Sequence, residues 1–102
     1  MIIYNVTVNV DKEVHEMWLA WMRNTHLPDV MATGHFIDAR ICRVLSEGDS
    51  GVTYAVQYTL KDMGEYERYI EHHADRLRAE SEKYYGVKAV AFRTLLEVIH
   101  TA

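Results

Sequence analysis

Two histidines in apolar surroundings are the side chains of this sequence that could best bind a ligand or move a proton. His26 lies just before Pro28, where a regular helix is expected to end, and could overhang a cavity between a helix and a sheet. His73 lies between Ile70 and Leu77 on the expected apolar stripe of a second helix. Imidazole titrates near neutral pH and can transfer protons. A backbone-bonded role for His26 and a satisfied core position for His73 remain open.

Aromatic residues form a second candidate group, because they recur at strand and helix spacing on the faces expected to meet. A concave apolar site with a few polar groups is the usual form of a small-molecule pocket. The same residues could instead fill the core, and a cavity of at least about 300 Å³ reaching either histidine would favour binding. The candidate ligand-binding residues are Tyr4, Tyr54, Tyr58, Trp18 and Trp21.

The remaining polar residues give no pattern for a metal or a cofactor, and we predict neither. The chain has six histidines, but the adjacent His72 and His73 would point about 100° apart on a helix. Cys42 is the single cysteine of the sequence and cannot form an internal disulfide. A reducing compartment, the cytoplasm, is therefore the expected location.

Length and charge exclude several classes of protein. The 102 residues suit one domain over residues 1–102, with 49% hydrophobic residues to form a core. Eleven Lys and Arg against fifteen Asp and Glu give a net charge of −4, which argues against nucleic-acid binding. No uncharged apolar stretch approaches the ~20 residues of a membrane helix, and no basic leader precedes Ile2.

The periodicity predicts six elements that would position these side chains. Strict alternation predicts strands at 2–10 and 52–60, and β-branched and aliphatic residues predict strands at 35–45 and 87–99. Helical spacing predicts helices from about 12 to 27, with Asp11 as N-cap, and from Asp62 to about Tyr84, ended by Gly86. Pro28 could open a further short turn through Met31, and residues 46–51 suit a hairpin connection.

The order βαββαβ predicts an α+β, ferredoxin-like fold, with a four-stranded antiparallel sheet and both helices on one face. The other face is expected to carry aliphatic residues, among them Ile3, Ile41 and Leu95. Such a patch usually marks an interface, so we predict a homodimer packed through this face. Arg93 is expected to pair with Glu97 or with the partner chain. The candidate dimer-interface residues are Asn5, Gln57, Arg93 and Glu97.

Four segments resemble the bacterial domain-of-unknown-function family 4286. They are 1–8 (MIIYNVTV), 26–34 (HLPDVMATG), 52–58 (VTYAVQY) and 91–98 (AFRTLLEV). The resemblance covers nearly the whole chain and implies a dimeric α/β barrel without assigning an activity. More distantly, the arrangement is similar to antibiotic-biosynthesis and haem-degrading monooxygenases. Asn5 and His73 fall in the elements that carry the haem-site residues there, but Met63 stands where a tryptophan is expected, and alternation turns Asn5 away from the helices.

Three hypotheses follow from these observations. The first is a cytoplasmic homodimer that binds a small aromatic or polyketide-like molecule between sheet and helices, with cofactor-independent oxygenase or isomerase chemistry resting on His26, His73 and Tyr54. The second is a non-catalytic dimerisation or interaction module with a filled core. The third is haem binding or degradation. The sequence does not decide whether the protein is an enzyme.

Overall fold

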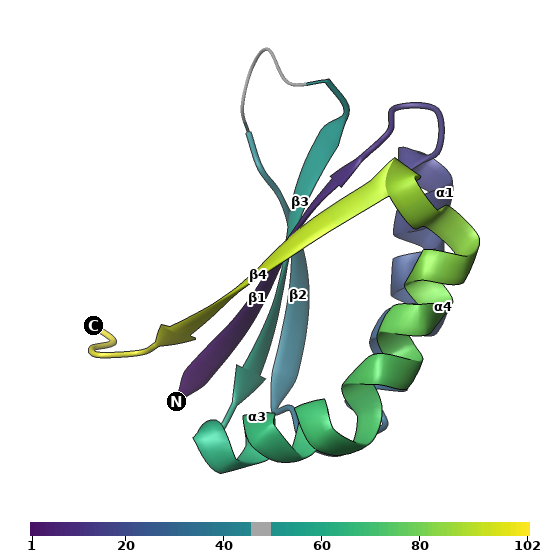
Figure 1. Ribbon diagram of the computed structural model, residues 1–102. Coiled ribbons are helices and arrows are strands. Elements are labelled where there is room, and N and C mark those ends of the chain that lie inside the picture. The colour runs from purple at the N-terminus through teal and green to yellow at the C-terminus, as the bar shows by residue number, and fades with distance from the viewer. Residues whose placement is uncertain (46–49) are drawn as a thin grey trace.

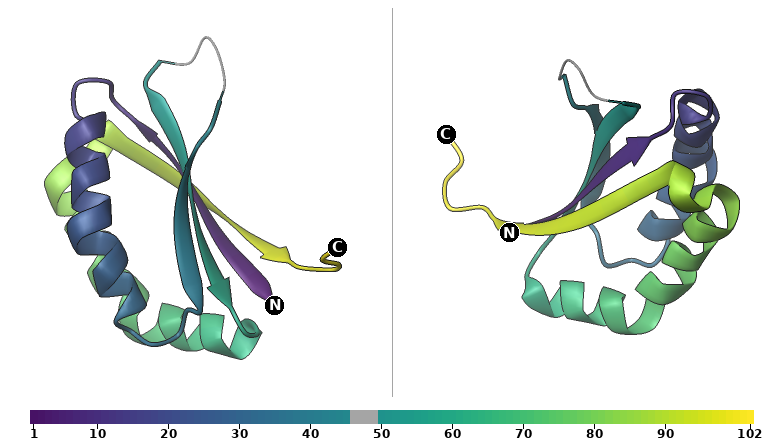
Figure 2. Two further views of the ribbon diagram at one scale, coloured as in Figure 1. Left: turned by 180° about the vertical axis from the view of Figure 1, so that it is seen from behind. Right: turned by 45° about the horizontal axis from the view of Figure 1, so that its top comes forward.

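The structure, a computed structural model, describes residues 1–45 and 50–102. Within these residues the chain forms an antiparallel four-stranded sheet in the order β2-β3-β1-β4, with two helical stretches between strands (Figure 1). Both stretches lie on the same face of the sheet, as the view from behind shows (Figure 2). The predicted βαββαβ order and ferredoxin-like fold are therefore confirmed.

The sheet is open, with β2 and β4 as its edges, so one chain does not form a closed barrel. β1 (Ile2–Val10) lies between β3 (Val52–Leu60) and β4 (Ala89–Glu97), and β2 (Asp38–Arg43) pairs with β3. β2 and β4 are shorter than their predicted ranges. Of the predicted hairpin connection, residues 46–49 lie outside the described residues.

The core lies between β1, β3 and the helices, and the even-numbered residues of both strands build its sheet side. The pairs Tyr4–Tyr58 and Val8–Tyr54 lie directly opposite each other in the β1–β3 register. All four side chains are buried, and Leu77 and Trp18, each 1% exposed, cover them from the helices. Alternation thus predicted this half of the sheet correctly, because one face is fully covered.

The first helical stretch begins later than predicted and continues without a break through Pro28 into the predicted turn that ends at Met31. It consists of α1 (His15–Trp21), a π-helical segment (Met22–His26) and α2 (Leu27–Met31). In the π segment the Leu27 N–H donates to the Met22 carbonyl, and this wider turn precedes Pro28. The predicted N-cap at Asp11 is wrong: the backbone carbonyl of Asp11 accepts from the Val14 N–H in a turn, and Val14 is the N-cap of α1.

The second helical stretch bends sharply around the corner of the sheet (Figure 1). Asp62 caps α3 (Met63–Tyr69) as predicted, since its Oδ1 accepts from the Glu65 N–H at 3.0 Å. A π-helical segment (Ile70–Ala74) joins α3 to α4 (Asp75–Tyr85). Gly86 follows α4 with φ at +51°, a conformation that only glycine adopts without strain, and a 3₁₀ turn (Gly86–Lys88) leads into β4.

The predicted face of several open-face residues is wrong, and the strand register gives the reason. Arg93 pairs with Val6, Leu95 with Tyr4 and Glu97 with Ile2, all on the helix-facing side of β1. Ile41 pairs with Val56 and also faces the helices. β4 carries apolar residues on both faces, so its alternation alone could not fix its orientation.

The sheet face turned away from the helices carries exposed apolar side chains on β4. On β4 it presents Val90, Phe92 and Leu96, of which Phe92 is 65% exposed. Asn5 and Gln57 lie opposite each other on this face, as predicted. We call the three β4 residues, together with their neighbour Ile3, the β4 strip.

Candidate functional site

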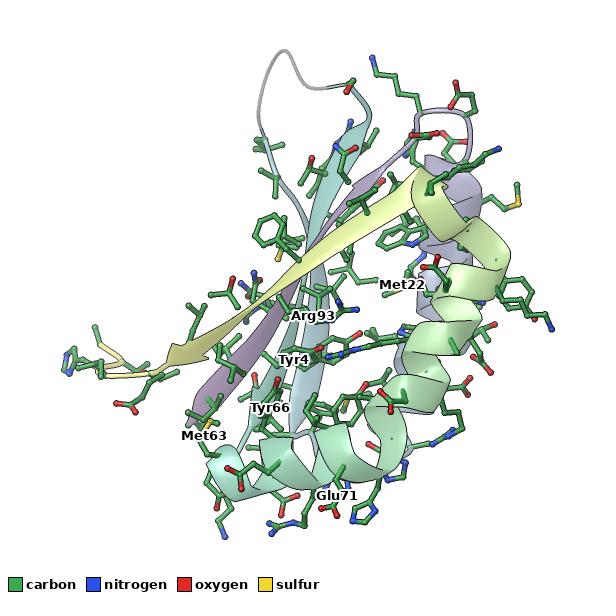
Figure 3. The ribbon with its side chains drawn as sticks, viewed as in Figure 1. Tyr4, Met22, Met63, Tyr66, Glu71 and Arg93 are labelled. Atoms are coloured by element: carbon green, nitrogen blue, oxygen red, sulfur yellow. The ribbon has the colours of Figure 1, made fainter. Side chains whose placement is uncertain are left out.

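A hollow between the sheet and the helices brings candidate residues from both helical stretches and three strands together. Its enclosed volume is about 60 Å³. Figure 3 shows Tyr4 and Arg93 pointing from the strands toward the helices, and Met22 approaching them from the helix side. The residues that line this inner hollow are Tyr4, Val6, Val8, Trp18, Met22, His26, Val56, Tyr58, Tyr69, Leu77, Arg78, Ser81, Ala89, Ala91 and Arg93.

His26 borders the inner hollow, as its position at the expected cavity mouth suggested. It is the last residue of the first π segment, and its ring stacks on Trp21 with centroids 4.7 Å apart. Its Nδ1 is buried and has no hydrogen-bond partner among the described residues. Burial lowers the pKa of His26 to about 4; Asp29 opposes this shift and Arg93 adds to it. The imidazole is therefore neutral at physiological pH, with a nitrogen free to bond a ligand.

Tyrosines form the deep wall of the inner hollow. The rings of Tyr4, Tyr58 and Tyr69 lie near one another, with 5.8 Å between the centroids of Tyr4 and Tyr58. Burial, and then the neighbouring Tyr4, raises the pKa of Tyr69 to about 12, and the pKa of Tyr58 is raised further by burial and by Tyr69. These hydroxyls keep their protons at neutral pH, so they can donate hydrogen bonds to a ligand.

Two arginines supply positive charge to the same hollow. An Arg78 Nη donates to the Tyr4 hydroxyl at 2.9 Å, whereas its buried Nε has no partner among the described residues. Arg93 approaches from β4 and is exposed. The predicted pairing with Glu97 is not found: within residues 1–45 and 50–102, Arg93 forms no intrachain ion pair.

A wider outer hollow of about 550 Å³ lies next to the inner one, between α4 and β4. The two share Arg78, Ser81, Ala89, Ala91 and Arg93. The inner hollow alone reaches His26 and is smaller than the about 300 Å³ expected of a pocket for a whole small molecule. The outer hollow exceeds that size without reaching His26. Only the two hollows together would provide both the volume for a small molecule and access to His26.

Two predicted ligand-binding residues lie outside the lining of both hollows. The Tyr54 hydroxyl is 3.0 Å from His15 Nδ1, and the Tyr54 ring packs on Trp18 with centroids 5.0 Å apart. Trp21 stacks on His26 and contacts Tyr85, behind the cavity wall. The structure thus brings Tyr4, Tyr58, Trp18 and His26 together and gives Tyr54 and Trp21 supporting positions.

His73 is in neither hollow, although its spacing predicted that it faces the sheet tyrosines. Its Nδ1 is 2.8 Å from an Arg76 nitrogen, and its ring lies 5.4 Å from that of His35. Arg76 and His35 contribute, after burial, to the lowered pKa of His73. His35 in turn bonds Glu65, with Nδ1 and Oε2 2.8 Å apart. The bend of the π segment from Ile70 to Ala74 breaks the ideal helical spacing that the prediction assumed.

The haem-site arrangement implied by the distant resemblance does not assemble. Asn5 lies on the face of β1 turned away from the helices, as alternation predicted, and His73 lies outside the hollow. Asn5 Nδ2 donates to Thr7 Oγ1 at 3.1 Å, while its buried Oδ1 has no partner among the described residues. The two side chains are therefore not presented to one cavity.

Metal-binding clusters and membrane-spanning helices are absent from the described ranges. No cluster of three or more His, Cys, Asp or Glu side chains there could hold a metal ion. None of the helices in these ranges is long and apolar enough to cross a membrane.

Sequence reasoning missed Arg78 as a site residue and placed Arg93 on the wrong face. Arg78 reads as part of the charged outer face of the second helix, because it stands among Glu and Arg residues. Its spacing one position after the buried Leu77 puts it at the border of the apolar stripe, which is the one available signal. Arg93 breaks the apolar pattern of β4, but only the register shows which face receives it.

The sequence matches a family model described as "Domain of unknown function (DUF4286)" over residues 1–99. No curated protein matches the sequence. A dimeric ferredoxin-like protein from an uncultured marine organism has a similar structure, with 15% identity, a TM-score of 0.69, and coverage of 99% of this chain and 97% of that one. A de novo designed protein with a ferredoxin fold has 17% identity, a TM-score of 0.51, and coverage of 99% and 88%. At these identities the likeness shows the fold alone.

Proposed function

The chain belongs to the DUF4286 family, and we propose that it is a homodimer that binds a small, partly aromatic molecule between its sheet and helices. One observation carries this proposal: His26, Arg78 and Arg93 approach one hollow from three elements, and two of them leave buried nitrogens without partners. Buried polar groups are normally bonded, and leaving one unbonded costs about 1–3 kcal/mol. A ligand that bonds these nitrogens would recover that cost.

The chemistry that fits this site best is proton transfer within a bound molecule, as in an isomerase. His26 is a weak base while its pKa is about 4, but a bound anion would raise that pKa and let the neutral imidazole accept a proton. Nearby guanidiniums can stabilise the negative charge that develops on the substrate. In a cofactor-independent oxygenase reaction the same base would remove a proton from a substrate carbon, and dissolved O2 would then oxidise the resulting carbanion and form the new C–O bond. In both cases His26 touches the substrate, whereas His73 does not.

The homodimer is supported by the β4 strip and by one orphaned atom. Phe92 and Val90 are 65% and 62% exposed on a sheet face that none of the described helices covers. Asn5 Oδ1, on the same face, is buried and lacks a donor among the described residues. A second copy packed on this face would bury the strip and could supply the donor. The similar marine protein is described as dimeric. Asn5 and Gln57 are proposed as interface residues. The cytoplasm is the proposed location of the protein.

A second candidate function is a dimerisation module without a ligand. The observation that favours it is the small enclosed volume of about 60 Å³. Against it, a module with only water in the inner hollow would leave Arg78 and Arg93 unexplained, because neither has an ion-pair partner among the described residues.

A cavity-filling substitution separates these two functions. Ala91→Leu places a larger side chain into both hollows, because Ala91 lines each of them. We expect a panel of small aromatic compounds to change the fluorescence of the wild-type protein, since Trp18 lines the inner hollow. Ala91→Leu should remove the change without unfolding the protein.

The matched control is Ala32→Leu, which adds the same side chain at an exposed position outside both hollows. It should respond to the panel like the wild type. A panel that leaves wild-type fluorescence unchanged, or that acts equally on both variants, would favour the dimerisation module instead.

A further inference from the structure

We propose that the cavity selects an organic carboxylate with an apolar body, whose carboxylate binds between Arg78 and Arg93. This inference rests on the proposed function and names the chemical class of the ligand. Both arginines border the inner and the outer hollow, so they stand where the two join. A ligand could place its charged group there and its body in the outer hollow.

The charge in the inner hollow is unbalanced, whereas in the outer hollow Asp75 and Glu82 match the two arginines in number. No Asp or Glu among the described residues lines the inner hollow, although two arginines do. The ion pairs within these residues involve Glu65 and Glu71, which leaves neither arginine with an anionic partner. Arg78 is partly buried, where a guanidinium is stable when paired, whereas Arg93 is exposed; the planar N–H donors of both match a carboxylate. An anion bound from solution could therefore pair with both arginines.

The volume of the inner hollow and the uncharged groups that line both hollows limit which anions could bind. The inner hollow of about 60 Å³ admits a group of a few atoms, and the protonated Tyr58 and Tyr69 hydroxyls can donate to it. Ala89 and Ala91 give the shared wall an apolar surface. Asp75 and Glu82 on the outer hollow would repel a second negative charge. A monoanion with an uncharged apolar body satisfies all these groups, and inorganic phosphate does not.

The test compares phenylacetate with the neutral, nearly isosteric phenylacetamide, using tryptophan fluorescence to obtain dissociation constants. Phenylacetate is expected to bind at least tenfold more tightly, the range of a charge-assisted hydrogen bond. Arg93→Met keeps most of the aliphatic stem and removes the charge, so it should abolish this preference. Arg93→Lys should restore part of it. Inorganic phosphate should not compete.

The matched control is Arg43→Met, because Arg43 lies on the helix-facing side of the far edge strand β2 and lines neither hollow. It should keep the preference for phenylacetate. Equal binding of the two compounds, or a preference that survives Arg93→Met, would overturn the carboxylate inference and leave the proposed ligand-binding function standing. Absence of binding by both compounds and by the aromatic panel would overturn both.

Discussion

Acidification from pH 7 to pH 4 is expected to lower the free energy of unfolding by roughly 3 kcal/mol through His26 alone. Burial lowers the pKa of this imidazole from 6.5 to about 4 in the folded protein. Between these two pH values the unfolded chain binds a proton that the folded chain does not, so stability falls as the pH falls. Well above pH 6.5 the imidazole is neutral in both the folded and the unfolded state, so this loss of stability is absent there.

The measurement is urea unfolding of wild type and His26→Asn at both pH values. Asn occupies a similar place and does not titrate, so the variant should lose roughly 3 kcal/mol less on acidification. Glu65, whose pKa is lowered by its bonds to His35 and Arg68, titrates in both proteins and cancels in the comparison. The same acid sensitivity in wild type and variant would show that His26 is not buried as described. A bound carboxylate should raise the pKa of His26 and reduce the effect.

Trp18→Ala is expected to lower the free energy of unfolding by about 3–5 kcal/mol, the typical cost of removing a large buried aromatic side chain. Trp18 is 1% exposed and packs on Tyr54 with ring centroids 5.0 Å apart, between the first helical stretch and β3. The substitution joins a new void to the inner hollow that Trp18 now lines. The surrounding strands cannot close such a void fully, because they are fixed by their ladders.

Chemical denaturation with urea measures this loss, and Met17→Ala is the matched control. Met17 precedes Trp18 on α1 and is 64% exposed, so its removal should change stability by no more than about 0.5 kcal/mol. A cost for Trp18→Ala below about 1 kcal/mol would mean that the helix does not pack on β3 at this position.

The fold could be predicted from the sequence because its central strands have one fully buried face. β1 and β3 alternate without interruption, and Asp62 and Gly86 mark the ends of the second helical stretch. The orientation of β4 could not be predicted, because an edge strand with one face toward the helices and one exposed apolar face carries hydrophobic residues on both. Its register depends on pairing with β1, which a single strand's pattern does not contain.

The site was predictable only in part, for a related reason. His26 was found because a proline marks its place at a helix turn, and Tyr4 and Tyr58 because they follow strand alternation. His73 and Arg78 were misjudged because the π segment between α3 and α4 rotates the helix relative to an ideal repeat. Arg78 therefore reaches the cavity, whereas His73 bonds with Arg76 near the bend.

Native mass spectrometry of the freshly purified protein tests the central claim most directly, because one spectrum gives both the oligomeric mass and any retained molecule. The wild type should appear at twice the 11.9 kDa chain mass, with a discrete additional small mass. Phe92→Asp should appear as the monomer, because it places a charge in the β4 strip. Met17→Asp, at an exposed residue of α1 that lines neither hollow, should remain dimeric. A wild-type spectrum of the bare 11.9 kDa monomer would contradict the account.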